Sequence, residues 1–389
     1  MLTLRVLRLI FPQGNNLKMG IVGLPNVGKS LFFNVLCNMQ VDSANFPFCT
    51  IDPNVSRVEV PDERYDDLCK NFKPKSCVPA YLSVTDIAGL VKGASEGAGL
   101  GNAFLSHIQA VDGIFHMLRA FDDPDVIHVD DEIDPVRDLD TIHGELIAKD
   151  LAAANKAWED FETNAKKSTT KKDKAWEARK ATLEKVKSSL EAGIDIRNVE
   201  WDGRDFPVIN ELPLITVKPV IYVANLSKKD FLRKKNKWLP KIKEWIDANG
   251  GGPLMPISAA FEKEYFDAED KEAYLKECGE GIKTMLPKLV VTGYEHLKLI
   301  HYFTCGPDEV RCWTIRQGTL APAAAGAVHS DFQLTFVKGE VYSYADYVEH
   351  GKTEAGVKAA GKFQLRGKTA VINDGDICHW KAGAAKGKK

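Results

Sequence analysis

The sequence predicts an α/β fold with a mainly parallel sheet, a helical insert and a second, smaller α+β domain at the C-terminal end. Three observations predict it. Short apolar runs alternate with helical stretches from residue 18 onward, the spacing of apolar residues changes between about residues 146 and 199, and Gly and Ala become frequent after residue 294. With 389 residues the chain is too long for one ordinary domain, which agrees with this division.

The apolar runs are expected to be strands because each is short and is bounded by loop or helix signals. They are residues 19–22, 55–60, 81–85, 113–118, 219–224 and 254–257. Strands that alternate with helical segments are typical of βαβ units, in which neighbouring strands run parallel. About a hundred residues separate the fourth run from the fifth, so we expect an insert between them.

The insert has a heptad-like spacing in two stretches. The positions that carry it are Ile147, Leu151, Ala154, Trp158 and Phe161 in the first, and Trp176, Leu183, Val186 and Leu190 in the second. This pattern predicts an antiparallel coiled-coil hairpin whose arms reach about 30 Å. Its turn is rich in Lys, which suits contact with RNA phosphates; a solvated turn between charged helices is an equally good interpretation.

The C-terminal part is expected to form a compact α+β domain of about ninety residues. We expect strands at residues 311–316, 331–337 and 370–372, with Gly- and Ala-rich segments between them. The domain boundaries that follow are a first domain of residues 18–145 and 200–298, an insert of 146–199, a C-terminal domain of 299–383 and a tail of 384–389. Residues 1–17 are interpreted as a disordered extension, with a short organellar presequence as the alternative.

Composition excludes several classes of protein. The formal net charge is −2, so a global basic field for nucleic acid is excluded and such binding requires local patches. Apolar runs are too short to span a bilayer, so a soluble protein is expected. The eight cysteines form no CxxC pair, and we interpret them as reduced thiols in a cytoplasmic protein.

A phosphate-binding motif follows the first expected strand. The eight residues Gly23 to Ser30 read GLPNVGKS, which matches GxxxxGK[ST], and a helical stretch begins directly after them. The glycines let main-chain N–H groups curl around phosphate oxygens, and the helix N-terminus favours their negative charge. Lys29 is expected to contact the β- and γ-phosphates and Ser30 to bind Mg²⁺. We expect nucleotide contacts from Asn26, Val27, Gly28, Lys29, Ser30 and Leu31.

Two further segments complete the expected phosphate side. Asp86 and Gly89 belong to a DxxG motif at the end of the third run, where ligands bind in open α/β sheets. Asp86 is expected to support the metal and Gly89 to contact the γ-phosphate. Thr50, between the two motifs, is a candidate Mg²⁺ ligand because of its order in the series.

The expected base side lacks an acidic residue. Guanine-specific P-loop proteins carry NKxD after the next strand, where the carboxylate accepts two hydrogen bonds from guanine. Here the segment reads Asn225-Leu226-Ser227-Lys228, and a lysine donates but cannot accept. Adenine has neither donor and loses nothing. Asp230 is the alternative acceptor if the register shifts.

Other base contacts are expected from residues near strand ends. The candidates are Phe121, Asn225, Leu226, Ser258 and Ala259. Ser258 has a helix cap as its alternative role, and Phe121 a place in the core. The complete series, in order along the chain, predicts a nucleotide-dependent switch.

Five segments of the chain resemble one family. They are GLPNVGKS, NFPFCTIDPN, DIAGLVKGAS, GLGN and FTCGPDEVRCWT, and the chain is similar to the Obg-like ATPases, or YchF group, over roughly residues 17–380. The resemblance implies a G domain, a coiled-coil insert and a C-terminal TGS domain. It also implies slow hydrolysis of ATP in preference to GTP, and association with ribosomes, in translation or stress regulation.

The sequence departs from the patterns of this family and its relatives at two positions. Members of the family usually carry Glu where this chain has Lys228, which leaves the base contact of that position open. Leu90 stands where Ras-like enzymes place a water-orienting Gln. The resemblance suggests His116 as a substitute, with a core histidine as the alternative. Asn26 resembles an asparagine that helps to hold K⁺ in related GTPases, so K⁺ joins Mg²⁺ as an expected cofactor.

The sequence thus predicts a cytoplasmic, monomeric Mg²⁺-dependent ATPase in which Lys29, Gly89 and His116 act in catalysis and Ser30, Thr50 and Asp86 hold the metal. Expected partners are ATP and the ribosome or its RNA, reached through the coiled coil and the TGS domain; neither DNA nor a membrane is expected. The alternatives are a GTPase of the same fold and an adaptor that keeps its nucleotide unhydrolysed.

Overall fold

A computed structural model describes residues 14–38, 54–87, 100–123, 132–167 and 173–383. These residues divide into two compact units. One contains Lys18–Ser56 and Val84–Leu286, and the other contains Gly14–Leu17, Arg57–Ser83 and Pro287–Lys389. In the described part of the chain, every helix is too short or too polar to cross a bilayer.

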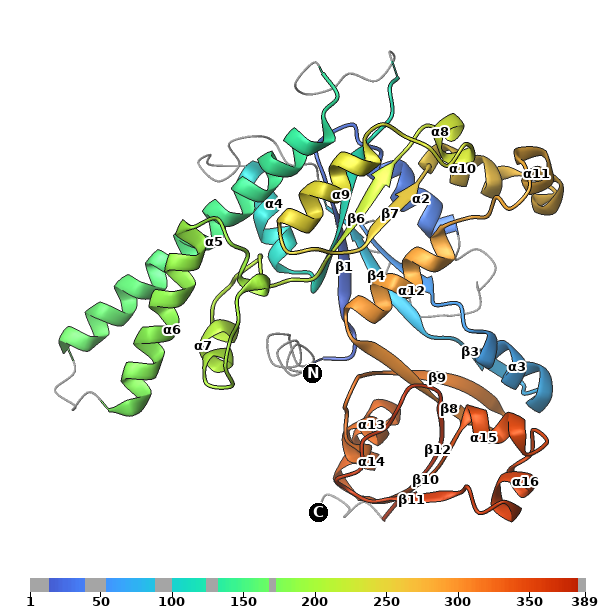
Figure 1. The fold of residues 1–389 in the computed structure, drawn as a ribbon. Coiled ribbons are helices and arrows are strands. Elements are labelled where there is room, and N and C mark those ends of the chain that lie inside the picture. The colour runs from blue at the N-terminus through green and yellow to red at the C-terminus, as the bar shows by residue number, and fades with distance from the viewer. Residues whose placement is uncertain (1–13, 39–53, 88–99, 124–131, 168–172, 384–389) are drawn as a thin grey trace. The chain divides into compact units, whose positions relative to one another are not determined.

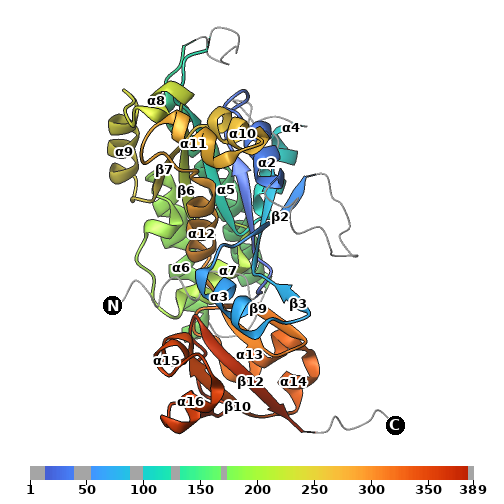
Figure 2. The same ribbon diagram turned by 90° about the vertical axis from the view of Figure 1, so that its right-hand side faces the viewer.

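The first sheet has the strand order β2-β4-β1-β5-β6-β7 (Figure 1). Its strands are β1 (Lys18–Val22), β2 (Val55–Glu59), β4 (Tyr81–Asp86), β5 (Gly113–Arg119), β6 (Val220–Asn225) and β7 (Leu254–Ile257). The pairs β1–β5, β5–β6 and β6–β7 are parallel, as the alternation of strands and helices predicts. All residues of β5 and β6 are buried, so both faces of the sheet are covered there (Figure 2).

Most helices of this unit connect its strands, and the last two follow the final strand. They are α2 (Lys29–Asn38), α4 (Leu100–Gln109), α5 (Pro135–Lys167), α6 (Lys174–Glu191), α7 (Asp205–Glu211), α8 (Lys228–Leu232), α9 (Leu239–Ala248), α10 (Ala259–Asp267) and α11 (Lys271–Cys278). A short 3₁₀ helix, η2 (Ile196–Asn198), follows α6. Side-chain caps begin several of them: Asp173 accepts from the Trp176 amide at the start of α6, as expected for an acidic N-cap.

The expected hairpin is present as α5 and α6, and its first helix begins at Pro135, earlier than the predicted insert. Near the sheet, the apolar residues of the hairpin pack against other elements as well as between the two helices. Ala154, Val186 and Leu190 pack in one cluster with Trp201 and with Phe206 of α7. Farther out, the rings of Phe161 and Trp176 stack with their centroids 5.1 Å apart.

The second unit is built on a mixed sheet with the order β11-β10-β12-β8-β9-β3. Its strands are β3 (Ser76–Val78), β8 (Leu299–Cys305), β9 (Glu309–Arg316), β10 (Phe336–Ser343), β11 (Gln364–Arg366) and β12 (Asp376–Ala382). Its helices are α3 (Glu63–Phe72), α12 (Leu286–His296), α13 (Ala321–Val328), α14 (Ser330–Leu334), α15 (Tyr344–Glu349) and α16 (Glu354–Ala359). The strand order shows that β3 joins this sheet although it lies far from the other strands of the sheet in the sequence. This pairing was not predicted from the sequence.

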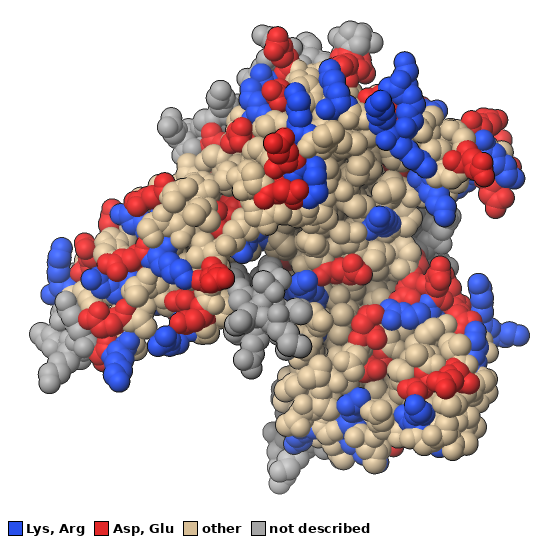
Figure 3. Space-filling model, in the orientation of Figure 1, with Lys and Arg blue, Asp and Glu red and all other residues tan. Residues whose placement is uncertain are grey.

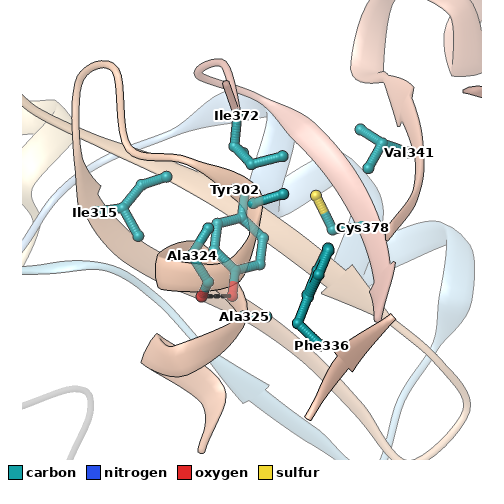
Figure 4. Close-up of a cluster of buried hydrophobic side chains, with 9 residues drawn as sticks. Tyr302, Ile315, Ala324, Ala325, Phe336, Val341, Ile372 and Cys378 are labelled. Carbon is teal, nitrogen blue, oxygen red and sulfur yellow. Dashed lines mark hydrogen bonds between the residues drawn. The ribbon is translucent and has the colours of Figure 1, made fainter. Parts of the chain in front are cut away.

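The core of this unit forms where α13 packs on the sheet (Figure 4). Three small alanines of α13 are buried against Tyr302, Phe336 and Cys378. The Tyr302 hydroxyl donates to the Ala324 carbonyl oxygen at 2.9 Å, so the one polar atom of this ring is satisfied. The Ala- and Gly-rich composition therefore reflects a helix held close to a sheet.

Two expected strands of this unit were wrong. Residues 331–337 alternate apolar and polar, but α14 occupies Ser330–Leu334 and β10 begins at Phe336. The His329 ring accepts from the Asp331 amide and caps this helix, a local signal that outweighs the alternation. Residues 370–372 supply one isolated bridge, Leu320 to Val371, instead of a strand. The expected strand at 311–316 is confirmed as β9.

The seven described cysteines are free, in agreement with reduced thiols. Residues 1–13 of the expected extension, the turn of the hairpin at 168–172 and the tail at 384–389 lie outside the described residues.

Candidate nucleotide site

The phosphate loop joins the end of β1 to the start of α2. Asn26 and Gly28 have φ angles of 63° and 99°, in the left-handed region that Asn tolerates and Gly favours. A Cβ atom at Gly23 would lie 2.5 Å from the Met117 carbonyl oxygen, so this glycine is required for close approach to β5. The motif thus forms the tight turn that its residue types predict.

Lys29 lies inside this loop. Its Nζ donates to the carbonyl oxygens of Gly23 at 3.1 Å and Leu24 at 2.7 Å, and the residue is buried. Burial lowers the pKa of Lys29 to about 8, and the nearby Asp86 carboxylate opposes this shift. The ammonium group is therefore already placed at the loop, held by main-chain acceptors that a phosphate can replace.

Ser30 and Asp86 lie together at the ends of α2 and β4. The Ser30 hydroxyl forms a hydrogen bond with Asp86, and burial raises the pKa of that carboxyl group, against the effects of Lys29 and Ser30. The Asp86 Oδ1 atom is buried and has no hydrogen-bond partner among the described residues. A hydroxyl and an orphaned carboxylate oxygen are donors that suit Mg²⁺. Thr50 and Gly89 lie outside the described residues, as does Leu90.

Asn225 connects the phosphate loop to the base side. Its side-chain Nδ2 donates to the Val27 carbonyl oxygen at 2.9 Å, and its Oδ1 accepts from the Ala259 amide at 3.0 Å. The next amide, that of Leu226, donates to the Ile257 carbonyl oxygen. Because a Cβ atom at Gly28 would lie 2.5 Å from Asn225 Nδ2, the glycine is needed for this contact as well.

Ser258 acts as a helix cap. It is fully buried, and its Oγ accepts from the Phe261 amide at the start of α10. The sequence offered this role as the alternative to a base contact. Its neighbour Ala259 supplies the main-chain amide that orients Asn225, so Ser258 supports the base side through its side chain and Ala259 through its main chain.

Lys228 contacts side chains of two helices. It forms an ion pair with Glu264 of α10, and its Nζ lies 5.1 Å from the centre of the Tyr274 ring of α11. The hydrogen bond to Glu264 raises the pKa of Lys228, so it stays charged. Asp230 is also engaged, because Arg233 and Asn236 donate to its carboxylate at 2.8 and 2.9 Å.

Arg119 was missed by the sequence analysis. It ends β5 opposite Asn225, is 1% exposed, and its guanidinium lies 4.8 Å from the centre of the Phe121 ring. It also donates to the carbonyl oxygens of Phe121 and Asp123. Phe121 is half-buried and is held by this arginine. An arginine at the last position of a mostly apolar strand was the available signal.

His116 lies in the middle of β5, paired with Val22 on one side and Tyr222 on the other. Burial lowers the pKa of His116 to about 3, and the nearby Arg197 and His143 act in the same direction. The Cε atom of Met117 lies 3.6 Å from a Cβ built at Gly28, so Met117 faces the phosphate loop and His116 the opposite face. Its catalytic role stays a prediction.

Comparison with known proteins agrees with this geometry. The 50S ribosome-binding GTPase family matches residues 18–156, and YchF-GTPase_C, described as a protein of unknown function, matches residues 299–383. Obg-like ATPase 1 of Oryza sativa subsp. japonica is 51% identical over 96% of this chain and 94% of its own length. The chain belongs to the Obg-like ATPase family.

Members from other organisms are equally similar. Obg-like ATPase 1 of Schizosaccharomyces pombe is 52% identical over 95% of each chain. A solved structure, that of the Schizosaccharomyces pombe YchF GTPase, has 51% identity and a TM-score of 0.87, and covers 95% of this chain and 99% of its own. The family and its P-loop fold are therefore established for this Obg-like chain.

Proposed function

We propose that the protein is a Mg²⁺-dependent ATPase that prefers ATP to GTP, converts ATP slowly to ADP and phosphate, and works as a conformational switch in the cytoplasm. The observation that carries the proposal is Lys228: it stands where a guanine-reading acid is needed, and it is paired with Glu264. With Asp230 also engaged, the described base side offers guanine no free carboxylate.

The phosphate chemistry rests on Lys29 and the loop. When the triphosphate displaces the Gly23 and Leu24 carbonyl oxygens from Lys29, the ammonium group stabilises charge that develops on the transferred γ-phosphoryl group. Asn225 supports the loop from the base side, because its Nδ2 donates to the Val27 carbonyl oxygen while its Oδ1 accepts from the Ala259 amide.

Ser30 and Asp86 support the metal in this proposal. The metal, when bound, neutralises charge on the β- and γ-phosphates. The buried Asp86 Oδ1 lacks a partner among the described residues and so suits a metal-bound water, while Ser30 supplies a hydroxyl oxygen. Thr50 and Gly89 complete the proposed set, in segments expected to relax after hydrolysis. A K⁺ ion beside the phosphates is a further part of the proposal, with Asn26, which is exposed in the loop, as the residue that helps to hold it.

In this proposal, the elements outside the nucleotide site transmit the change of conformation to a partner. The hairpin α5–α6 and the C-terminal unit are proposed to contact a ribosomal partner. The curated relatives carry the name Obg-like ATPase, and the family that matches residues 18–156 is described as ribosome-binding. The same family and the solved relative are described as GTPases, so GTP is the second candidate substrate.

Competition between ATP and GTP for one fluorescent nucleotide analogue, with Mg²⁺ present, tests the proposal. We expect ATP to displace the analogue at lower concentration than GTP. Phosphate release is then measured with each nucleotide, with and without K⁺ and ribosomes, and with the Lys29→Ala variant as the control for contaminating enzymes. A clear advantage for GTP in both measurements would replace the ATPase by a GTPase, and turnover that persists in Lys29→Ala would contradict both.

A further inference from the structure

A strongly basic segment begins at the base side of the nucleotide site and runs into α9. Of the sixteen residues from 228 to 243, eight are Lys or Arg and one, Asp230, is an acid. The basic residues are Lys228, Lys229, Arg233, Lys234, Lys235, Lys237, Lys241 and Lys243. Figure 3 shows blue side chains grouped around α8 at the upper right of the molecule. The nearly neutral chain therefore carries a local positive patch here.

Half of these cations lack a carboxylate partner within the described part of the chain. Arg233 pairs with Asp230, Lys237 with Asp122, Lys243 with Asp247 and Lys228 with Glu264. The others are exposed and form no ion pair with any described residue; they are Lys229, Lys234, Lys235 and Lys241. Their charge is available to a partner.

An apolar pocket adjoins this patch. It has a volume of about 380 Å³, and its apolar lining comes from Leu226, Phe231, Leu239, Pro256, Ile282 and Met285. Four of these side chains are half-buried, so apolar surface faces the pocket instead of being covered by the fold. Pockets of roughly 300 to 1,000 Å³ with an apolar lining and a few polar groups are typical of ligand sites.

One of the two charged groups at this pocket, that of Lys234, is held by hydrogen bonds. Lys234 and Lys283 both line it. Lys234 has a φ of 52°, an uncommon conformation for a lysine, and its amide donates to the Phe231 carbonyl oxygen at 3.0 Å. Its Nζ lies 3.4 Å from the carbonyl oxygen of Gly281, another lining residue with a φ of 72°. The turn therefore places an ammonium group at the pocket.

We propose that the pocket and the basic segment 228–243 together form a docking site for an acidic peptide that carries one large apolar side chain. The apolar side chain would fill the pocket against Phe231, Leu239 and Met285, and the acidic residues around it would meet Lys234, Lys235 and Lys283. A nucleic-acid backbone would match the charge but leave the apolar lining without a partner. Charge complementarity of this kind also speeds and orients association.

The site borders the base side, with which it shares Leu226, and shares none of the residues expected at the phosphates or the metal. Leu226 lines the pocket, and it directly follows Asn225, which holds the phosphate loop. A peptide in the pocket thus touches the segment that carries Asn225. Since the proposed peptide contacts do not include Lys29, Ser30 or Asp86, the two ligands are expected to bind together.

The test uses the full chain and a short fluorescent peptide of Asp and Glu residues around one Phe, measured by fluorescence anisotropy. The Lys234→Glu/Lys235→Glu variant and the Met285→Glu variant are each expected to weaken binding about tenfold or more, and added salt should weaken it as well. Replacing the Phe of the peptide by Ala should have an effect of the same size. Unchanged ATP affinity shows that each variant is folded.

A matched control is Lys156→Glu/Lys174→Glu, which changes the net charge equally at exposed positions of the hairpin. It should alter peptide affinity less than about twofold. Equal binding of the Phe and Ala peptides would overturn the proposal, because the pocket would then play no part. Displacement of the peptide by ATP would also overturn the proposal. The same holds if the peptide fails to bind while a single-stranded RNA binds in a way that depends on Lys234 and Lys235.

Discussion

The phosphate side and the base side of the nucleotide site are built in different ways. The phosphate side is one continuous segment, Gly23 to Ser30, whose main chain makes the turn and whose lysine bonds to carbonyl oxygens of the same segment. The base side comes from three separate strand ends, at Phe121, Asn225 and Ser258, and side chains decide its properties.

This difference indicates which side of the nucleotide site can accept a substitution and still bind nucleotide. A loop that binds through its own amides keeps its function only if its glycines and lysine remain. A base side made of separate side chains can exchange one residue, here the acid for Lys228, while the rest of the site persists. This contrast predicts effects that range from loss of turnover at Lys29 to an altered choice of base at Lys228.

Removing the phosphate-side cation should have the largest effect. Lys29→Ala removes the charge that stabilises the transferred phosphoryl group, and kcat is expected to fall by about 100- to 1,000-fold. Phosphate release under saturating ATP measures this. Lys338→Ala, a lysine of the other unit, should leave kcat unchanged; a Lys29→Ala enzyme with near-normal kcat would mean that the loop does not carry the chemistry.

Asn225→Ala should weaken both nucleotides together. It leaves the Val27 carbonyl oxygen and the Ala259 amide without partners, and each such buried group costs about 1 to 3 kcal/mol. We expect the Kd for ATP and for GTP to rise about ten- to a hundredfold, with their ratio constant, and Tm to fall. Asn249→Ala, which removes a bond to the Trp245 carbonyl oxygen outside the site, should lower Tm without changing either Kd. A changed ratio would assign Asn225 a direct part in base choice.

Lys228→Asp should change the choice of base. It places a carboxylate at the position that reads guanine, and a charged hydrogen bond contributes about 1.5 to 3 kcal/mol, so the GTP-to-ATP affinity ratio should rise about tenfold. Glu264→Gln is the matched control, because it breaks the ion pair and adds no acid. If Glu264→Gln shifts the ratio as much, the ion pair itself controls base choice.

The depressed pKa of Lys29 predicts a pH dependence of nucleotide binding. With a pKa of about 8 in the folded protein, Lys29 is protonated at neutral pH and loses its proton as the pH rises through this value. The Kd for ATP should therefore rise by a few-fold between about pH 7 and 9, and binding near pH 8.5 should take up protons. Calorimetry in buffers of different ionisation enthalpy measures this uptake. Lys29→Arg, which stays charged, should show none.

The smallest effect on turnover is expected from His116→Leu. Because His116 faces away from the phosphate loop and is neutral, kcat should change less than about threefold, while Tm changes with the core packing. The measurement is phosphate release beside a thermal melt. A fall of tenfold or more in kcat, with Tm unchanged, would instead support the predicted part of His116 in positioning water.

Much of the first unit could be predicted from the sequence. The strands of its mainly parallel sheet, which are β1, β2, β4, β5, β6 and β7, lie within about one residue of the expected runs, and α5 and α6 form the expected hairpin. The C-terminal sheet was predicted less well. At Asp331 a local cap made a helix from an alternating segment, and β3 entered this sheet from a distant part of the chain. Neither the helix cap nor the pairing of β3 produces a repeating pattern of apolar residues that could be recognised in the sequence.

For the site, the sequence by itself determined the phosphate side. The turn, the helix start and the place of Lys29 all depend on neighbours within eight residues, so residue types and spacing suffice. It also determined that position 228 cannot accept from guanine.

The tertiary structure alone decided which partners the remaining side chains have. It directed Lys228 to Glu264, Ser258 to a helix start, His116 to the face opposite the phosphate loop and Arg119 onto Phe121. Each of these contacts joins residues from different elements, or depends on which face of a strand is covered. Such contacts follow from how the elements pack, which no local pattern of residues specifies.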